Sequence, residues 1–179
     1  MTAGEHILVI GYGNPGRSDD GLGPRAAEQV ERAGLPGVRV LTDYQLNVEH
    51  AADVAESETV VFIDAVMGAD ERAFSFRRLL PRRADAFSTH VMRPEAVLAL
   101  AQEALEWRGR AYLLGIRGCE FGAFAEALSA GARQNLDAAV AFLVDAIRSR
   151  ELDSVVTDAA TDDSDGPCQD GEPCTKAST

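Results

Sequence analysis

Short apolar runs alternate with segments of helical periodicity along most of this chain. Apolar runs bounded by glycine or polar residues are typical of buried strands, and apolar residues that recur every three or four positions are typical of helices packed on a sheet. Five segments are predicted to be strands: residues 6–10, 38–42, 59–63, 73–80 and 110–116. Four segments are predicted to be helices: one ending near Ala33, one from Asn47 to about Glu56, one over 94–107, and one from about Ser129 to about Leu152.

Residues with special backbone preferences support these boundaries. Pro24 suits the first turn of a helix, where its missing N–H costs little, and Gly34 with the nearby Pro36 should end that helix. Pro94 should open the third helix, and Ser129 is a suitable N-cap for the fourth. The hydrophobic pattern stops near residue 152.

The alternation of strands and helices predicts one α/β domain over residues 1–152. We expect a three-layer α/β/α arrangement, phosphorylase/hydrolase-like, with a twisted, mostly parallel sheet of five strands. The strand over 73–80 should lie nearer an edge, because Arg77 and Arg78 follow Phe76 within it. Ligand sites in such folds form at the carboxyl ends of the strands.

Charge divides the chain into a body and a tail. Residues 151–179 contribute −7 of the formal net charge of −12. Residues 153–179 contain few large apolar side chains, so we expect an acidic, disordered tail. The body lacks the basic footprint of a nucleic-acid-binding protein. No apolar run is long enough for a transmembrane helix and the first residues do not resemble a signal peptide, so the expected location is the cytoplasm.

Three cysteines are present, and this odd number argues against a disulfide framework. Cys119 lies in the body and could in principle be activated by His90 as the nucleophile of a cysteine protease. Cys168 and Cys174 lie in the tail, where they could bind a metal ion, form a local bridge, or belong to an extension without a role.

A glycine-rich loop follows the first strand and admits more than one interpretation. The spacing G-x-G-x-x-G of a dinucleotide-binding protein of the Rossmann type is matched by Gly11, Gly13 and Gly16. Asp43, after the second strand, could then bind a ribose. However, Asp19 and Asp20 follow the loop directly and would repel a pyrophosphate, which prefers positive or neutral surroundings at a helix N-terminus.

The same loop also resembles the Gly-Asn-Pro-Gly turn of peptidyl-tRNA hydrolases. That family requires a catalytic histidine soon after the loop, whereas this chain has Ser18-Asp19-Asp20-Gly21 there and no histidine before His50. A mildly acidic body also suits tRNA poorly.

Taken together, several motifs resemble the maturation proteases of nickel–iron hydrogenases. The first is Gly-x-Gly-Asn, a spacer, Asp-Asp-Gly and then Gly-x-x-Ala, over residues 11–26. The others are Phe62-Ile63-Asp64-Ala65-Val66, Ser88-Thr89-His90 before a helix, Leu114-Gly115-Ile116 with the following Glu120, and Leu128-Ser129. Each motif is weak alone, but their order and spacing over residues 6–148 are specific. The loop over residues 116–121 is most similar to members that serve soluble, NAD-linked hydrogenases.

This resemblance implies a metal site made of Asp20, Asp64 and His90, which would also be the catalytic residues. The first acid is often Glu in the family, so Asp20 is shorter by one methylene. Two carboxylates and an imidazole suit Ni²⁺ or Zn²⁺, and three protein ligands leave positions open for a substrate. Asp19 is expected to shape the loop.

The resemblance further implies an endopeptidase, of the type classed with aspartyl proteases, that removes the C-terminal extension of a nickel-loaded large-subunit precursor. The nickel would come with the substrate, and no organic cofactor is expected. Nickel could polarise the scissile carbonyl or activate a water molecule, or it could only position the peptide for a carboxylate base. A nickel-binding chaperone without proteolytic activity would use the same ligands, and the protein is expected to be a monomer.

Overall fold

The computed structural model describes residues 6–67, 72–83, 92–122 and 124–157. Its sheet contains five strands: β1 (Ile7–Tyr12), β2 (Val38–Asp43), β3 (Thr59–Val66), β4 (Phe74–Leu79) and β5 (Arg110–Arg117). The helices are η1 (Ser18–Gly21, a 3-10 turn), α1 (Leu22–Arg32), α2 (His50–Ala55), α3 (Pro94–Leu105) and α4 (Ala130–Ser149). All five strands and four helices expected from the sequence are confirmed, with ends that differ by a few residues.

The strand order is β2-β1-β3-β5-β4, and only the β4–β5 pair is antiparallel. The prediction of a mostly parallel five-stranded sheet is therefore confirmed, as is the edge position of β4. Residues 7–10 of β1 and 60–63 of β3 are all apolar, as expected for central strands that are covered on both faces.

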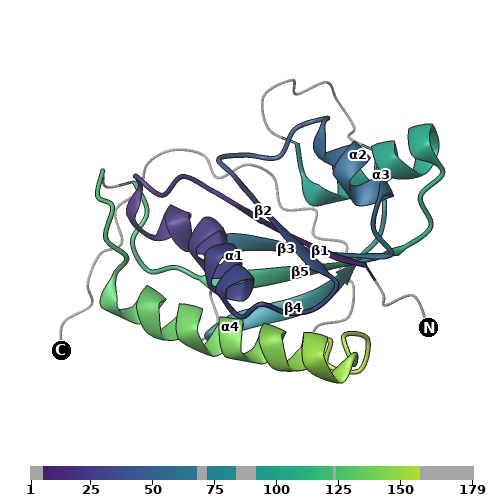
Figure 1. The fold of residues 1–179 in the computed structure, drawn as a ribbon. Coiled ribbons are helices and arrows are strands. Elements are labelled where there is room, and N and C mark those ends of the chain that lie inside the picture. The colour runs from purple at the N-terminus through teal and green to yellow at the C-terminus, as the bar shows by residue number, and fades with distance from the viewer. Residues whose placement is uncertain (1–5, 68–71, 84–91, 123, 158–179) are drawn as a thin grey trace.

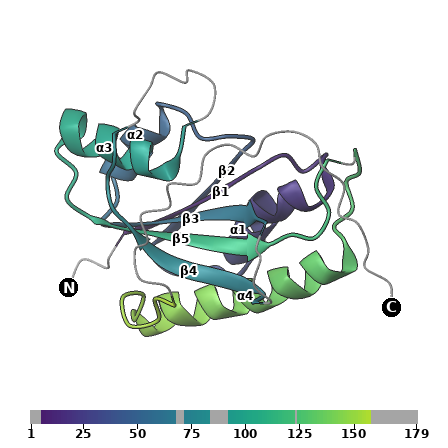
Figure 2. The same ribbon diagram turned by 180° about the vertical axis from the view of Figure 1, so that it is seen from behind.

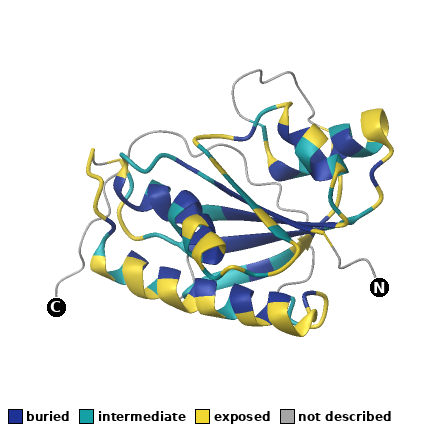
Figure 3. Ribbon diagram, in the orientation of Figure 1, coloured by how far each residue is buried: buried dark blue, intermediate teal, exposed yellow. Residues whose placement is uncertain are grey.

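Helices cover both faces of the sheet (Figures 1 and 2). On one face α1 and α4 enclose a core with the inward side chains of β1, β3 and β5, including Val9, Ile63 and Leu114. On the other face α2 and α3 pack on Ile10 and Phe62. Figure 3 shows the buried stripe of α1 and α4 turned toward the sheet. The expected α/β/α layers are thus confirmed.

Local signals act as the sequence indicated. Pro24 lies in the first turn of α1, and Gly34 adopts a positive φ of 60° just after that helix ends. Pro94 begins α3, and the Ser129 hydroxyl accepts a hydrogen bond of 3.2 Å from the Ala132 N–H at the start of α4.

Beyond α4, residues 153–157 lie against the edge of the sheet. The Thr157 N–H donates to the Phe76 carbonyl at 2.8 Å, and the Phe76 N–H donates to the Thr157 hydroxyl at 2.9 Å. The described structure therefore continues five residues past the point where the hydrophobic pattern stops. The rest of the predicted tail, residues 158–179, lies outside the described residues, and the division into a body and a disordered tail stays a prediction.

The direction of chain crossovers changes at β1. Strand β1 pairs with β2 on one side and with β3 on the other, and the two connections run over opposite faces of the sheet. Open α/β sheets bind ligands in the crevice at such a reversal, outside the carboxyl ends of the strands. A ligand site is therefore expected at the carboxyl ends of β1 and β3.

Candidate functional site

Asp64 lies near the carboxyl end of β3, beside the crossover reversal. Its Oδ1 accepts a hydrogen bond of 2.8 Å from the Ala65 N–H. Burial raises the pKa of Asp64 to about 6, and the charge of Asp20 contributes to this rise, whereas hydrogen bonds from Tyr12 and Ala65 oppose it. A half-buried carboxylate that is desolvated and faces a second carboxylate is typical of functional sites.

Asp20 reaches the same edge from the loop after β1. Its Oδ2 accepts a hydrogen bond of 2.9 Å from the Asn14 N–H, and the side chain is half-buried. The loop turns tightly enough that a Cβ on Gly13 would lie 2.1 Å from the Asp20 carbonyl oxygen, which explains the glycine and its φ of 136°. Asp20 lies close enough for its charge to contribute to the raised pKa of Asp64.

This arrangement gives the glycine loop a different purpose from dinucleotide binding. The Asn14 N–H points to the Asp20 carboxylate, and the Gly16 N–H donates to the Asn14 side chain at 2.9 Å. These backbone donors are therefore engaged within the loop. Asp43, the proposed ribose ligand, accepts a hydrogen bond of 2.6 Å from the Tyr44 N–H. The loop geometry counts against the dinucleotide interpretation.

Asp19 has a structural role, as the sequence suggested. Its side chain is fully buried, and its carboxylate accepts hydrogen bonds of 2.8 Å from the N–H groups of Cys119, Glu120 and Ser129 and from the Ser129 hydroxyl. Burial alone would raise the pKa of Asp19, but these hydrogen bonds outweigh it and hold the pKa below the ordinary 3.8. Asp19 therefore anchors the loop after β5 and the start of α4 to the loop that carries Asp20.

His90, the third predicted ligand, lies outside the described residues, as does the neighbouring Ser88. The described chain resumes just before α3, whose first turn is tied to the sheet by an ion pair of 3.2 Å between Glu95 and Arg77. Within the described ranges, no cluster of three or more His, Cys, Asp or Glu side chains could hold a metal ion. The Asp20, Asp64 and His90 ligand set therefore stays a prediction.

The two described carboxylates nonetheless suit a cation. Each is half-buried, and the charge of Asp20 disfavours ionisation of Asp64. A cation near these two carboxylates would relieve that repulsion.

Cys119, the alternative nucleophile, is exposed in the loop after β5. Its backbone N–H is bound to Asp19, and its Sγ lies against α4, where a Cβ on Gly131 would be 2.9 Å away. Glu120 is also exposed, and its carbonyl accepts a hydrogen bond from the Asp19 N–H at 3.2 Å. The described contacts of both residues maintain the loop.

Tyr12 is the site residue that sequence reasoning missed. Its hydroxyl donates a hydrogen bond to the Asp64 carboxylate, and burial, followed by the charge of Asp64, raises the pKa of Tyr12 well above its ordinary value. One sequence signal could have identified it. Tyr12 follows the buried Leu8 and Ile10 at alternate positions, so it points to the same face at the functional end of the strand.

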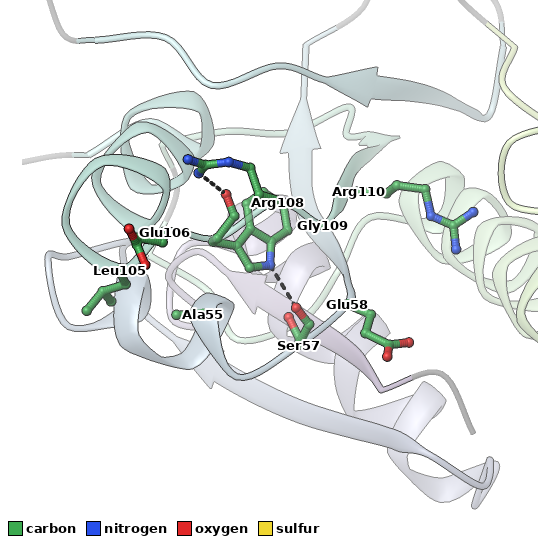
Figure 4. A pocket seen from close by; sticks show the side chains of 9 residues that line it. Ala55, Ser57, Glu58, Leu105, Glu106, Arg108, Gly109 and Arg110 are labelled. Carbon is green, nitrogen blue, oxygen red and sulfur yellow. Dashed lines mark hydrogen bonds between the residues drawn. The ribbon is translucent and has the colours of Figure 1, made fainter. Parts of the chain in front are cut away.

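A hollow of about 580 Å³ lies elsewhere, near the amino ends of β3 and β5 (Figure 4). Trp107 forms part of its wall and donates a hydrogen bond of 2.7 Å from Nε1 to the Ser57 carbonyl. Neither Asp20 nor Asp64 lines this hollow. Open α/β sheets bind ligands at the carboxyl ends of their strands, where the two aspartates lie, and not at the amino ends.

In architecture, the chain is an α/β protein with its candidate site at a crossover reversal. Among solved structures, it is similar to the nickel–iron hydrogenase maturation protease HycI from Thermococcus kodakarensis KOD1, with 22% identity, 82% of this chain and 95% of that chain covered, and a TM-score of 0.65. It is also similar to the hydrogenase maturating endopeptidase HybD from E. coli, with 19% identity, 82% and 94% coverage, and a TM-score of 0.64.

A third similar structure is the hydrogenase 2 maturation peptidase from Thaumarchaeota archaeon SCGC_AB-539-E09, with 24% identity, 80% of this chain and 98% of that chain covered, and a TM-score of 0.59. No family model matches the sequence, and no curated protein matches it. The chain therefore shares the fold of hydrogenase maturation proteases over almost their whole length.

Proposed function

We propose that this chain is an endopeptidase that removes the C-terminal extension of a nickel-loaded nickel–iron hydrogenase large-subunit precursor. The observation that carries this proposal is the position of Asp64 at the crossover reversal, where burial and the charge of Asp20 raise the pKa of its carboxyl, in a fold shared with maturation proteases. The proposed metal ligands are Asp20, Asp64 and His90, and the nickel is part of the substrate. No organic cofactor is required.

Asp64 suits either of the two chemical roles that the sequence left open. As a metal ligand, it would contribute one oxygen while the precursor supplies further ligands to nickel. As a general base, its raised pKa of about 6 makes it a better proton acceptor than an ordinary carboxylate and leaves it mostly ionised at pH 7. Cleavage of a positioned precursor without nickel would support the base role and count against Lewis-acid catalysis by the metal.

The decisive experiment mixes the full chain with purified nickel-loaded precursor and follows the precursor by mass spectrometry. We expect loss of a C-terminal peptide, and we expect Asp64→Ala and His90→Ala each to reduce the rate by at least about 100-fold, as is usual for removal of a metal ligand or catalytic base. Asp145→Asn is the matched control, because Asp145 lies on α4 and its side chain is 81% exposed.

The result also separates the protease from a nickel-binding chaperone. Tight binding of the precursor with unchanged mass would reject proteolysis and favour the chaperone. Full activity of both Asp64→Ala and His90→Ala would reject the proposed site, whatever the reaction.

We propose a partner, a cellular location and an oligomeric state to accompany this function. The partner is the folded large-subunit precursor, and the enzyme is proposed to act as a cytoplasmic monomer. No helix in the described ranges is long and apolar enough to cross a membrane. Light scattering of the free protein and of its mixture with the precursor tests both the monomer and the complex.

A further inference from the structure

Tyr12 and Asp64 occupy neighbouring positions on adjacent strands. In the parallel β1–β3 pair, Gly11 lies opposite Ile63, so the next residues along each strand are Tyr12 and Asp64. The residues two positions earlier, Ile10 and Phe62, both belong to the core under α2 and α3. Because side chains alternate along strands, Tyr12 and Asp64 project from the same face of the sheet as those two residues.

The Asp64 carboxylate is thereby held by two donors. One is the Ala65 N–H, which donates to Oδ1 at 2.8 Å, and the other is the Tyr12 hydroxyl. A backbone donor and a phenol from the adjacent strand together restrict rotation of the carboxylate. Such restraint matters for a metal ligand, because hydrogen bonds to ligating carboxylates set their orientation.

A phenol hydroxyl can donate a hydrogen bond, whereas an ionised carboxylate only accepts, so the contact runs from the Tyr12 hydroxyl to the Asp64 carboxylate. Two further charged groups act on the phenol, Glu95 on α3 and Arg77 on β4. They pair with each other at 3.2 Å, so their opposite charges partly cancel near Tyr12.

We propose that Tyr12 is a positioning residue that orients the Asp64 carboxylate toward the substrate's metal. The proposal rests on the function proposed above and adds a residue that acts through Asp64 without touching the reacting atoms. Removing the hydroxyl leaves Asp64 in place but lets its carboxylate rotate. The turnover number should therefore fall, while the docking of the precursor should remain.

The test compares Tyr12→Phe with the matched control Tyr112→Phe in the full chain. Tyr112 also donates to a carboxylate, that of Asp153 at 2.5 Å, but it pairs with Val61 and Arg78 toward the opposite end of the sheet. We expect Tyr12→Phe to lower kcat for precursor cleavage roughly 10- to 100-fold, the usual effect of losing a hydrogen-bond partner of a metal ligand. KM should change by less than about threefold, and Tyr112→Phe should leave both constants near wild type.

A second measurement does not depend on cleavage. The side-chain carboxyl ¹³C resonance of Asp64, assigned by its loss in Asp64→Asn, should shift in Tyr12→Phe and stay in place in Tyr112→Phe. A shift in a protein that fails to cut the precursor would uphold the Tyr12–Asp64 contact and reject the proposed protease function. An unchanged resonance, or wild-type kcat in Tyr12→Phe of an active enzyme, would overturn the role of Tyr12.

Discussion

At the scale of single residues, two aspartates at the same end of the sheet have opposite roles. Asp19 is surrounded by four donors, which stabilise its charge and make it an anchor. Asp64 is also desolvated, but it has fewer donors and faces the charge of Asp20. Its charged form is therefore destabilised in the folded protein, as expected for a group that is retained for function.

The raised pKa of Asp64 makes a prediction about stability and pH. A carboxyl whose pKa is about 6 when folded and 3.8 when unfolded favours folding most below pH 3.8, and this advantage is lost as pH rises through 6. Asp64→Asn, which cannot ionise, should therefore be more stable than wild type at pH 7.5, by about 2–3 kcal/mol at most. At pH 4 the difference should nearly vanish.

Urea denaturation at pH 4 and pH 7.5 measures this difference, with the exposed Asp145→Asn as the control. A gain in stability of equal size at both pH values would contradict the prediction, because a gain that does not depend on pH cannot arise from the ionisation of Asp64. A loss of stability at pH 7.5 would mean that hydrogen bonds to the ionised Asp64 outweigh its desolvation.

At the scale of elements, glycines allow α1 to begin directly against the sheet. A Cβ on Gly23 would lie 2.2 Å from the Tyr12 carbonyl oxygen and 2.6 Å from the Ile63 carbonyl oxygen. A Cβ on Gly11 would lie 2.2 Å from the Gly23 carbonyl oxygen. The first turn of α1 therefore contacts the ends of both β1 and β3, and this contact sets where the Asp20 loop leaves the sheet.

Gly23→Ala tests this contact, because helix propensity predicts that the substitution stabilises the protein, whereas packing predicts that it destabilises the protein. In an open helix, alanine is favoured over glycine by about 0.5–1 kcal/mol. Here the added methyl meets backbone atoms that cannot move aside, so we expect destabilisation by about 3 kcal/mol. Gly16→Ala is the control, since its Cβ would meet only the Asn14 side chain at 3.2 Å. Denaturation midpoints measure both, and a stabilised Gly23→Ala would disprove the close approach.

At the scale of the whole molecule, the segment after α4 joins the end of the chain's body to the edge of the sheet. Asp153 receives hydrogen bonds from Tyr112 and from Arg110, the latter at 2.9 Å, and Thr157 bonds to both backbone groups of Phe76. Val155 and Val156 pack against the core under α1 and α4. The segment covers an edge strand that would otherwise be open to other chains.

Two truncations test this contribution. Ending the chain after Leu152 removes these contacts and should lower Tm by roughly 5–10 °C, as a loss of about 2–3 kcal/mol does in a protein of this size. Ending it after Thr157 keeps every contact named above, so Tm should stay near that of the full chain. Thermal unfolding followed by circular dichroism measures both. Equal Tm values for the two truncated proteins would show that residues 153–157 do not stabilise the fold.

Much of this architecture was predictable because it depends on local patterns. The β3 run from Thr59 to Ile63 is apolar and β-branched, and such a run has little alternative to a buried strand. Pro94 and Ser129 marked helix starts through backbone preferences that need no tertiary contacts. In the described part of the candidate site, Asp20 and Asp64 were expected at one edge of the sheet, because Asp20 follows β1 and Asp64 lies near the carboxyl end of the parallel strand β3. Their role as metal ligands stays a prediction.

The features that were not predictable depend on contacts between segments that are distant in the sequence. The sequence by itself determined the elements and the mostly parallel sheet, because propensity, periodicity and strand direction act within or between short segments. Only the tertiary structure decided that Tyr12 contacts Asp64, that Asp19 is an anchor for the loop after β5, and that residues 153–157 lie along β4. These roles depend on strand register and on close approach between distant segments; Asp19 and Ser129, for example, are 110 residues apart. No local sequence pattern encodes such contacts.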